Sequence, residues 1–180
     1  MTTGLSDRVR NARRAALVAA VVTVAAFQLS GSLGLRINTS PSLPMGLYIT
    51  TADASANLVE FCPVEPFATL SRVRGYRAPG ACGDGAGPLL KPIVAKAGDV
   101  VEVSALGISV NGILLHNTAP LSADTKGRHL DAWPSGHYVV FPGTIWVASS
   151  YHPGSFDSRY FGPIPEDLVR NCVRPLLALR

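Results

Sequence analysis

Two serines on a proline-stiffened loop are the first candidates for chemistry. Residues 38–48 read NTSPSLPMGLY, so Ser40 and Ser42 alternate there with Pro41 and Pro44. Proline fixes its own φ at about −65° and drives the preceding residue towards extended backbone. A serine held in this way can act as a nucleophile beside a membrane. The alternative interpretation is a surface linker.

A serine nucleophile needs a base that takes its proton, and a lysine is the best candidate here. Lys91 lies in the apolar segment GPLLKPIVA. Burial disfavours the ammonium form and lowers the lysine pKa, which leaves a neutral amine able to accept a serine proton. The alternative is a solvated Lys91 on an edge strand. Lys96 precedes a Gly-Asp turn and is expected in solvent.

The histidines offer no comparable base, because none of them stands in a recognisable Ser-His-Asp context. Each is expected in a loop or on the surface; they are His116, His129, His137 and His152. A zinc site is not indicated, since the sequence has no C-x-x-C pair and the histidines are far from the cysteines. We therefore expect no metal and no cofactor.

Three sequence boxes, in order, resemble those of the Ser-Lys signal peptidases. That family carries a serine box just after a transmembrane anchor, a lysine seven residues before a Gly-Asp pair, and an S-x-D-S-R-Y-x-G box. The matching segments here are TSPSLP, Lys91 ahead of Gly98-Asp99, and SFDSRYFG at 155–162. The resemblance implies that Ser42 is the nucleophile, Lys91 the general base and Ser40 an oxyanion donor. We therefore expect Lys91 to be largely buried, with its amine within hydrogen-bond reach of the Ser42 hydroxyl.

The third box supplies supporting residues. By the same resemblance, Ser155 orients the lysine amine while Asp157 and Arg159 brace the site, and Ser158 is carried over with them. An unpaired carboxylate would raise the lysine pKa again, and an arginine two residues away can neutralise it.

Departures from the housekeeping enzymes favour one branch of the family. YHPG at 151–154 replaces G-D-N-R, and Pro92 stands where an arginine usually follows the lysine. The N-x-S-x-S-x-P-x-G-L-Y form, the C-P at 62–63 and SFDSRYFGP resemble the TraF-type conjugal transfer peptidases. This resemblance implies a membrane-bound serine endopeptidase that processes an exported precursor, a conjugative pilin, by leader removal or with cyclisation. A general signal peptidase and a non-catalytic component of a conjugative secretion apparatus are the alternatives.

The N-terminal region predicts a membrane anchor. Residues 15–35 are uncharged and rich in Ala and Val, and about 20 such residues cross a bilayer as a helix. Arginines precede this run, and basic residues stay on the cytoplasmic side. We therefore expect a cytoplasmic tail at 1–14, an inner-membrane anchor at 15–35 and a periplasmic peptidase domain at 36–180, with the lipid bilayer as a partner. A cleaved signal peptide is the alternative.

Charge and cysteines add two expectations. The net charge of +4 is concentrated in the arginine-rich tail, so nucleic acid is not an expected partner. Cys62 and Cys82 fall in the exported part, where disulfides persist. We expect them to be bridged and Cys172 to be free, although Cys172 is an alternative partner. The residues between the pair look poor in core side chains.

The elements that must position these residues are mostly short strands. They are expected at 58–61, 100–103, 107–115, 137–141 and 144–149, with a hairpin turn at Asn111-Gly112. Residues 116–136 read as a long polar connection, and PEDLVRNC at 165–172 gives a helical hint. We therefore predict a mostly β domain of short antiparallel strands, signal-peptidase-like by resemblance, behind one N-terminal transmembrane helix.

Overall fold

The computed structural model describes residues 10, 13–14, 16–18, 33–53 and 55–178. It divides the chain into two compact units, residues 1–36 and 37–180. Within the described ranges no helix is both long and apolar enough to cross a membrane. Most of the predicted anchor (15 and 19–32) and most of the predicted cytoplasmic tail lie outside the described residues.

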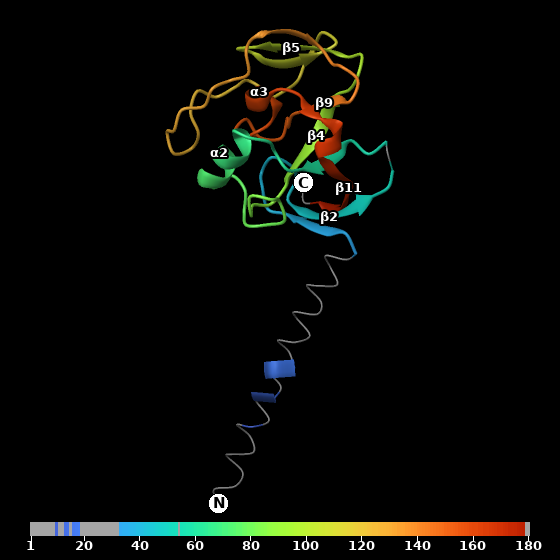
Figure 1. Cartoon of the computed structure of the whole chain (residues 1–180), viewed down its shortest axis with the longest axis vertical. Helices are drawn as coiled ribbons and strands as arrows, with labels where there is room; N and C mark the ends of the chain where they lie inside the picture. Colours follow the sequence, from blue (N-terminus) through green and yellow to red (C-terminus); the bar gives the residue numbers. More distant parts are fainter. Residues whose placement is uncertain (1–9, 11–12, 15, 19–32, 54, 179–180) are drawn as a thin grey trace, which may run out of the picture. The chain divides into compact units, whose positions relative to one another are not determined.

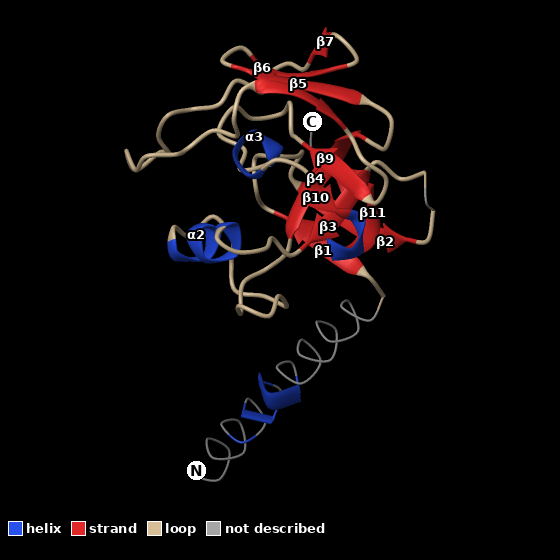
Figure 2. Ribbon diagram, turned by 45° about the horizontal axis from the view of Figure 1, so that its top comes forward, coloured by secondary structure: helices blue, strands red, loops and turns tan. Residues whose placement is uncertain are grey.

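The larger sheet has seven strands in the order β1-β2-β11-β3-β4-β9-β10 (Figure 2). Neighbouring strands from β2 to β10 are antiparallel. Expected strands 58–61 and 144–149 correspond to β3 and β9. The strand bounds are β1 Leu35–Asn38, β2 Gly46–Thr51, β3 Leu58–Phe61, β4 Leu89–Ala95, β9 Thr144–Val147, β10 Ile164–Pro165 and β11 Val169–Ala178.

The smaller sheet has the order β7-β6-β5-β8 and accounts for the other three expected strands. Asn111 and Gly112 both have positive φ, as a tight hairpin turn between β6 and β7 requires. Figure 1 shows β5 at one end of the 37–180 unit and β2 and β11 at the other, with β4 and β9 between them. The bounds are β5 Val100–Ser104, β6 Gly107–Val110, β7 Ile113–Leu114 and β8 Gly136–Val139.

Two apolar clusters hold these layers together. One lies under the smaller sheet, where alternate residues of β5 pack with Trp146. The other joins the larger sheet to the helices α2 (Phe67–Val73) and α3 (Ser158–Phe161) through a group of aromatic side chains. Its buried members are Val59, Phe61, Leu89, Leu130, Ile145, Val147, Phe156, Tyr160, Phe161 and Ile164.

The helical hint at 165–172 is wrong. Only a short 3₁₀ helix forms, at Glu166–Leu168, and the strand β11 follows it. β11 lies between β2 and β3 and pairs with both, and Val173 in it is 1% exposed. Two long-range partners therefore outweigh a local helical preference that is weak by itself.

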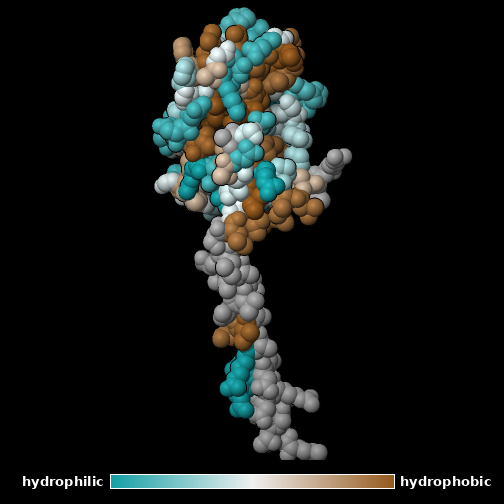
Figure 3. Space-filling view, turned by 90° about the vertical axis from the view of Figure 1, so that its right-hand side faces the viewer, coloured by the Kyte–Doolittle hydropathy of each residue, from teal (hydrophilic) through white to brown (hydrophobic). Residues whose placement is uncertain are grey.

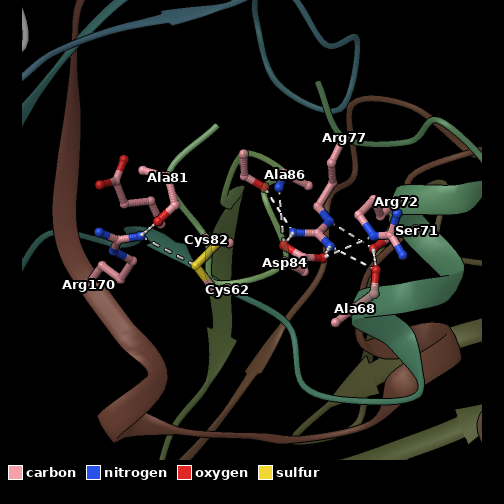
Figure 4. The surroundings of a disulfide bond; sticks show 12 residues. Cys62, Ala68, Ser71, Arg72, Arg77, Ala81, Cys82, Asp84, Ala86 and Arg170 are labelled. Atoms are coloured by element: carbon pink, nitrogen blue, oxygen red, sulfur yellow. Dashed lines mark hydrogen bonds and ion pairs between the residues drawn. A yellow bond between two sulfur atoms is a disulfide. The ribbon is translucent and has the colours of Figure 1, made fainter. Parts of the chain in front are cut away.

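The segment between Cys62 and Cys82 contributes more to the core than its sequence indicates. The two cysteines form a disulfide, the predicted pairing, and Cys172 is free. Inside the loop they close, α2 turns Phe67 and Leu70 towards the aromatic cluster. Figure 4 shows the disulfide on one side of this region and the Arg77–Asp84 ion pair on the other. We call residues 62–82 the disulfide loop.

Candidate active site

We call residues 39–44, which carry Ser40 and Ser42, the serine loop. A polar side chain holds this loop at each of its ends. The Asn38 amide at the end of β1 donates to the carbonyls of Ser40, Leu43 and Pro44 at 3.0, 3.1 and 3.1 Å, and its oxygen accepts from the Ser40 N–H at 3.1 Å. Tyr48 in β2 donates to the Pro44 carbonyl at 2.6 Å. These contacts explain the Asn and Tyr of N-x-S-x-S-x-P-x-G-L-Y, to which the sequence analysis assigned no role.

Within this loop the two serine hydroxyls are hydrogen-bonded to each other. The Oγ atoms of Ser40 and Ser42 lie 2.7 Å apart, and the Ser42 N–H donates to Ser40 Oγ at 3.3 Å. Ser42 is buried, with 8% of its surface exposed. A group that binds to one of these two hydroxyl oxygens therefore also lies close to the other.

Lys91 is buried in β4 and is 3% exposed. Its Nζ donates to Ser155 Oγ at 3.0 Å. Desolvation by burial lowers the Lys91 pKa to about 8; the Asp157 carboxylate opposes that shift and the Arg159 guanidinium adds to it. The amine is therefore partly neutral at pH values near 8, as a general base requires.

The expected hydrogen bond between Lys91 and Ser42 is not present among the hydrogen bonds of the described residues. The amine is bonded to Ser155 and the Ser42 hydroxyl to Ser40, so each group is satisfied by another partner. Contacts of this type in ligand-free enzymes often form only when the substrate is bound.

Asp157 and Arg159 form a fully buried ion pair, both side chains being 0% exposed. Arg159 Nε donates to Asp157 Oδ1 at 2.8 Å and Nη2 to Oδ2 at 3.0 Å. The guanidinium also donates to three carbonyls, those of Asn117, Pro153 and Ser149. Asp157 in addition caps the start of α3. The pair thus holds several loops around Lys91 and leaves no unpaired charge beside it.

Ser149 is a site residue that the sequence analysis missed. Its N–H donates to Asp157 Oδ2 at 3.0 Å, and its hydroxyl donates to the Ser42 carbonyl. It therefore connects the serine loop to the ion pair. Nothing in the sequence marked it, because Ser149 simply follows the apolar run TIWVA and gains its role from a partner 107 positions away.

The site thus holds a hydrogen-bonded pair of serine hydroxyls and a buried amine of lowered pKa, which are groups that acyl transfer by a serine uses. No histidine in the described part of the chain hydrogen-bonds to Ser40, Ser42 or Lys91. His129 is exposed and bonded to Asp131. Nor do the described residues contain a group of three or more His, Cys, Asp or Glu able to hold a metal ion.

Comparison with known proteins places the chain in a family. The family model described as signal peptidase, peptidase S26, matches residues 9–176. A plasmid transfer protein TraF from Escherichia coli is 34% identical over 171 residues, which cover 92% of this chain and 96% of that protein. A probable conjugal transfer protein TraF from Sinorhizobium fredii is 36% identical over 169 residues, covering 89% of this chain and 88% of the relative.

Among solved structures, a signal peptidase I from Enterococcus faecalis matches with a TM-score of 0.36 and 16% identity, over 68% of this chain and 97% of that one. The mostly β fold of antiparallel sheets and the order of the three boxes agree with the family match. The chain belongs to the signal peptidase family, peptidase S26.

Proposed function

We propose that this protein is a membrane-bound serine endopeptidase in which Ser42 is the nucleophile and Lys91 the general base. The observation that carries the proposal is the buried Lys91, with a pKa lowered to about 8. The Asp157 carboxylate, whose charge acts on the Lys91 pKa, accepts a hydrogen bond from the Ser149 N–H, and the Ser149 hydroxyl donates to the carbonyl of Ser42. A buried lysine of lowered pKa is typical of a base that activates a serine.

In the proposed mechanism, Ser42 Oγ attacks the scissile carbonyl and its proton passes to Lys91. The Ser40 hydroxyl and a backbone N–H stabilise the oxyanion. Lys91 then returns the proton to the leaving amine, and water resolves the acyl-enzyme. If the amino terminus of the acylated fragment attacks instead, an amide bond forms, Ser42 is released and the product is cyclic. For the first step the Ser42 hydroxyl turns from Ser40 towards Lys91, which stays anchored by Ser155.

For the substrate we propose an exported, membrane-tethered precursor of a conjugative transfer apparatus, of the pilin type. The relatives are described as plasmid or conjugal transfer proteins, which supports this choice over a general signal peptidase. Ser155, Asp157 and Arg159 would keep Lys91 oriented during processing, as the family box implies.

We place the site at the bilayer surface, in a periplasmic domain (36–180) behind a single anchor at 15–35. Exposed apolar side chains near the serine loop support this placement: Met45, Leu176 and Leu177 are 51%, 52% and 64% exposed, and Leu177 pairs with Leu47 across β11 and β2. Figure 3 shows hydrophobic surface exposed between polar residues. A substrate tethered in the same membrane would meet Ser42 at high local concentration.

The test is co-expression with a candidate pilin precursor, followed by the mass of the pilin. Wild type is expected to shorten it, whereas Ser42→Ala and Lys91→Arg leave it unprocessed, since guanidinium stays protonated and cannot act as a base. Lys96→Arg is the matched control, because Lys96 is exposed. Ser40→Ala should slow processing about 10²–10³-fold if its hydroxyl serves the oxyanion.

Each result decides between alternatives. Processing by Lys91→Arg would refute the general-base role, and processing by Ser42→Ala would support the non-catalytic assembly role. A product lighter than the linear form by one water identifies cyclisation. Cleavage of an unrelated secretory preprotein at the same rate would favour a general signal peptidase.

A further inference from the structure

Hydrogen bonds between described residues hold the serine loop, residues 39–44, mostly from its own flanks. Two of the residues that hydrogen-bond to it, Asn38 and Tyr48, flank it on adjacent strands β1 and β2. Among hydrogen bonds between described residues, Ser149 is the one partner that reaches residues 39–44 from elsewhere in the chain. Ser149 lies just after β9 and is hydrogen-bonded to Asp157.

Every polar group of Ser149 is used. Its N–H donates to Asp157 Oδ2 at 3.0 Å, and its carbonyl accepts from Arg159 Nη2 at 2.8 Å. The hydroxyl donates to the Ser42 carbonyl and accepts from the Tyr151 N–H. The side chain is fully buried, at 0% exposure. The ion pair thus fixes the backbone of Ser149, and the hydroxyl transmits that position to Ser42.

We infer that Ser149 is a positioning residue for the reaction: its hydroxyl holds the backbone of Ser42 in line with Lys91. The inference rests on the proposed function. Ser149 contacts the backbone carbonyl of Ser42 and not its Oγ, so it acts through another residue and exchanges no proton with the substrate. It joins the Asp157–Arg159 pair, whose charges act on the Lys91 pKa, to the loop that carries the Ser42 hydroxyl.

Loss of this hydroxyl should affect geometry and leave the base unchanged. The Ser42 carbonyl would lose its bond to the frame, and the loop would be held only from its own flanks. A displacement of about 1 Å between reacting groups can cost about 100-fold in rate. Burial, Asp157 and Arg159 determine the Lys91 pKa, and none of them depends on the Ser149 hydroxyl.

The experiment compares Ser149→Ala, Ser149→Cys and Ser150→Ala in the full chain, purified in detergent, with the pilin precursor as substrate. Ser150 is the matched control, since its hydroxyl makes no hydrogen bond within the described part of the chain and only its carbonyl is used. Single-turnover rates are measured against precursor concentration and pH, and thermal unfolding of each variant is recorded.

For Ser149→Ala we expect kcat to fall about 10- to 100-fold, while KM changes less than about threefold and the pH midpoint stays at the wild-type value. Ser149→Cys keeps a weak donor of similar size and should retain an intermediate rate. Ser150→Ala should match wild type. If Ser149→Ala does not fold, the kcat, KM and pH midpoint of Ser149→Cys are compared with those of wild type instead.

Two outcomes would overturn the inference. A Ser149→Ala rate within about threefold of wild type, below ~1 kcal/mol, would show that the flanking residues suffice to place Ser42. A shifted pH midpoint would show that Ser149 merely stabilises the ion pair around Lys91. Full activity of Ser42→Ala in the same assay would instead refute the proposed function, so the two failures are distinguishable.

Discussion

Two regions of this molecule are built around a buried arginine paired with an aspartate, and they differ in what lies beside the pair. Arg159 and Asp157 are both 0% exposed, whereas Arg77 is 1% and Asp84 19% exposed. Each guanidinium also ties distant backbone together: Arg159 bonds the carbonyls of Asn117, Pro153 and Ser149, and Arg77 those of Ala68 and Gly87.

The difference lies in the neighbours. The Arg159–Asp157 pair acts on the pKa of Lys91, where the two charges have opposite effects. In the Arg77–Asp84 pair, Arg77 lies in the disulfide loop and donates to the Ser71 hydroxyl, whereas Asp84 lies just beyond Cys82 (Figure 4). The same kind of ion pair therefore shifts the pKa of Lys91 in one region and links backbone segments in the other. Mutations in the two pairs should for that reason have different effects.

The two regions are also in contact. Phe156 lies between Ser155 and Asp157 in sequence, and its ring packs on Tyr76 and Phe67 of the disulfide loop, at centroid distances of 5.3 and 6.5 Å. The disulfide loop thus contacts the segment that carries Ser155 and Asp157 through aromatic rings.

The largest expected effect is that of Asp157→Asn, compared with Asp84→Asn. The first leaves Arg159 buried without a counter-charge, which typically costs about 3–5 kcal/mol of unfolding free energy. It also loosens Ser149 and the Lys91 surroundings, so we expect processing to slow about 100-fold or more. Asp84→Asn should process within about twofold of wild type. Precursor cleavage rates and denaturant unfolding measure both; equal rates for the two variants would contradict the distinction.

The pH dependence of processing sharpens the comparison. In the proposed mechanism the neutral amine of Lys91 is the active form, so the rate should rise with pH through the Lys91 pKa of about 8 and fall about tenfold per unit below it. In Asp157→Asn the carboxylate that favours the ammonium form is gone, so the midpoint of the residual activity should move to lower pH. Asp84→Asn should keep the wild-type midpoint; a midpoint shift there would refute the separation of roles.

The disulfide should matter for stability more than for chemistry. Cys62 and Cys82 are separated by 20 positions, and a cross-link of that span contributes about 3 kcal/mol. The double variant Cys62→Ser/Cys82→Ser should therefore unfold at lower denaturant concentration and still process precursor at low temperature. Cys172→Ser is the control for removing a thiol. Loss of processing in a folded double variant would show that the disulfide loop controls the site directly.

The sequence alone was enough to nominate most residues of the candidate site. Ser42, Lys91 and the Asp157–Arg159 box stand in recognisable spacings, and compartment and loop composition pointed to Cys62–Cys82. Sequence reasoning missed features that only long-range pairing creates. β11 is a strand because β2 and β3 flank it, and α2 packs because the disulfide loop folds back on the core. Ser149 belongs to the site because Ser42, distant in sequence, lies against it.

The smallest expected effect is on thermal stability, and it concerns the two arginines near Asp84. Both approach the same carboxylate, but they differ in burial and in their other partners. Arg77 is 1% exposed and bonds Ser71, Ala68 and Gly87 as well as Asp84, whereas Arg72 is 47% exposed and only approaches Asp84 Oδ2, at 4.0 Å. An exposed pair gains little, because water screens it and ordering two side chains costs entropy. Arg72→Met should therefore leave the thermal unfolding midpoint within about 2 °C of wild type. Arg77→Met should lower it by several times more, since buried carbonyls lose their donor. A fall as large for Arg72 as for Arg77 would mean that charge near Asp84, and not the buried hydrogen bonds of Arg77, holds the disulfide loop.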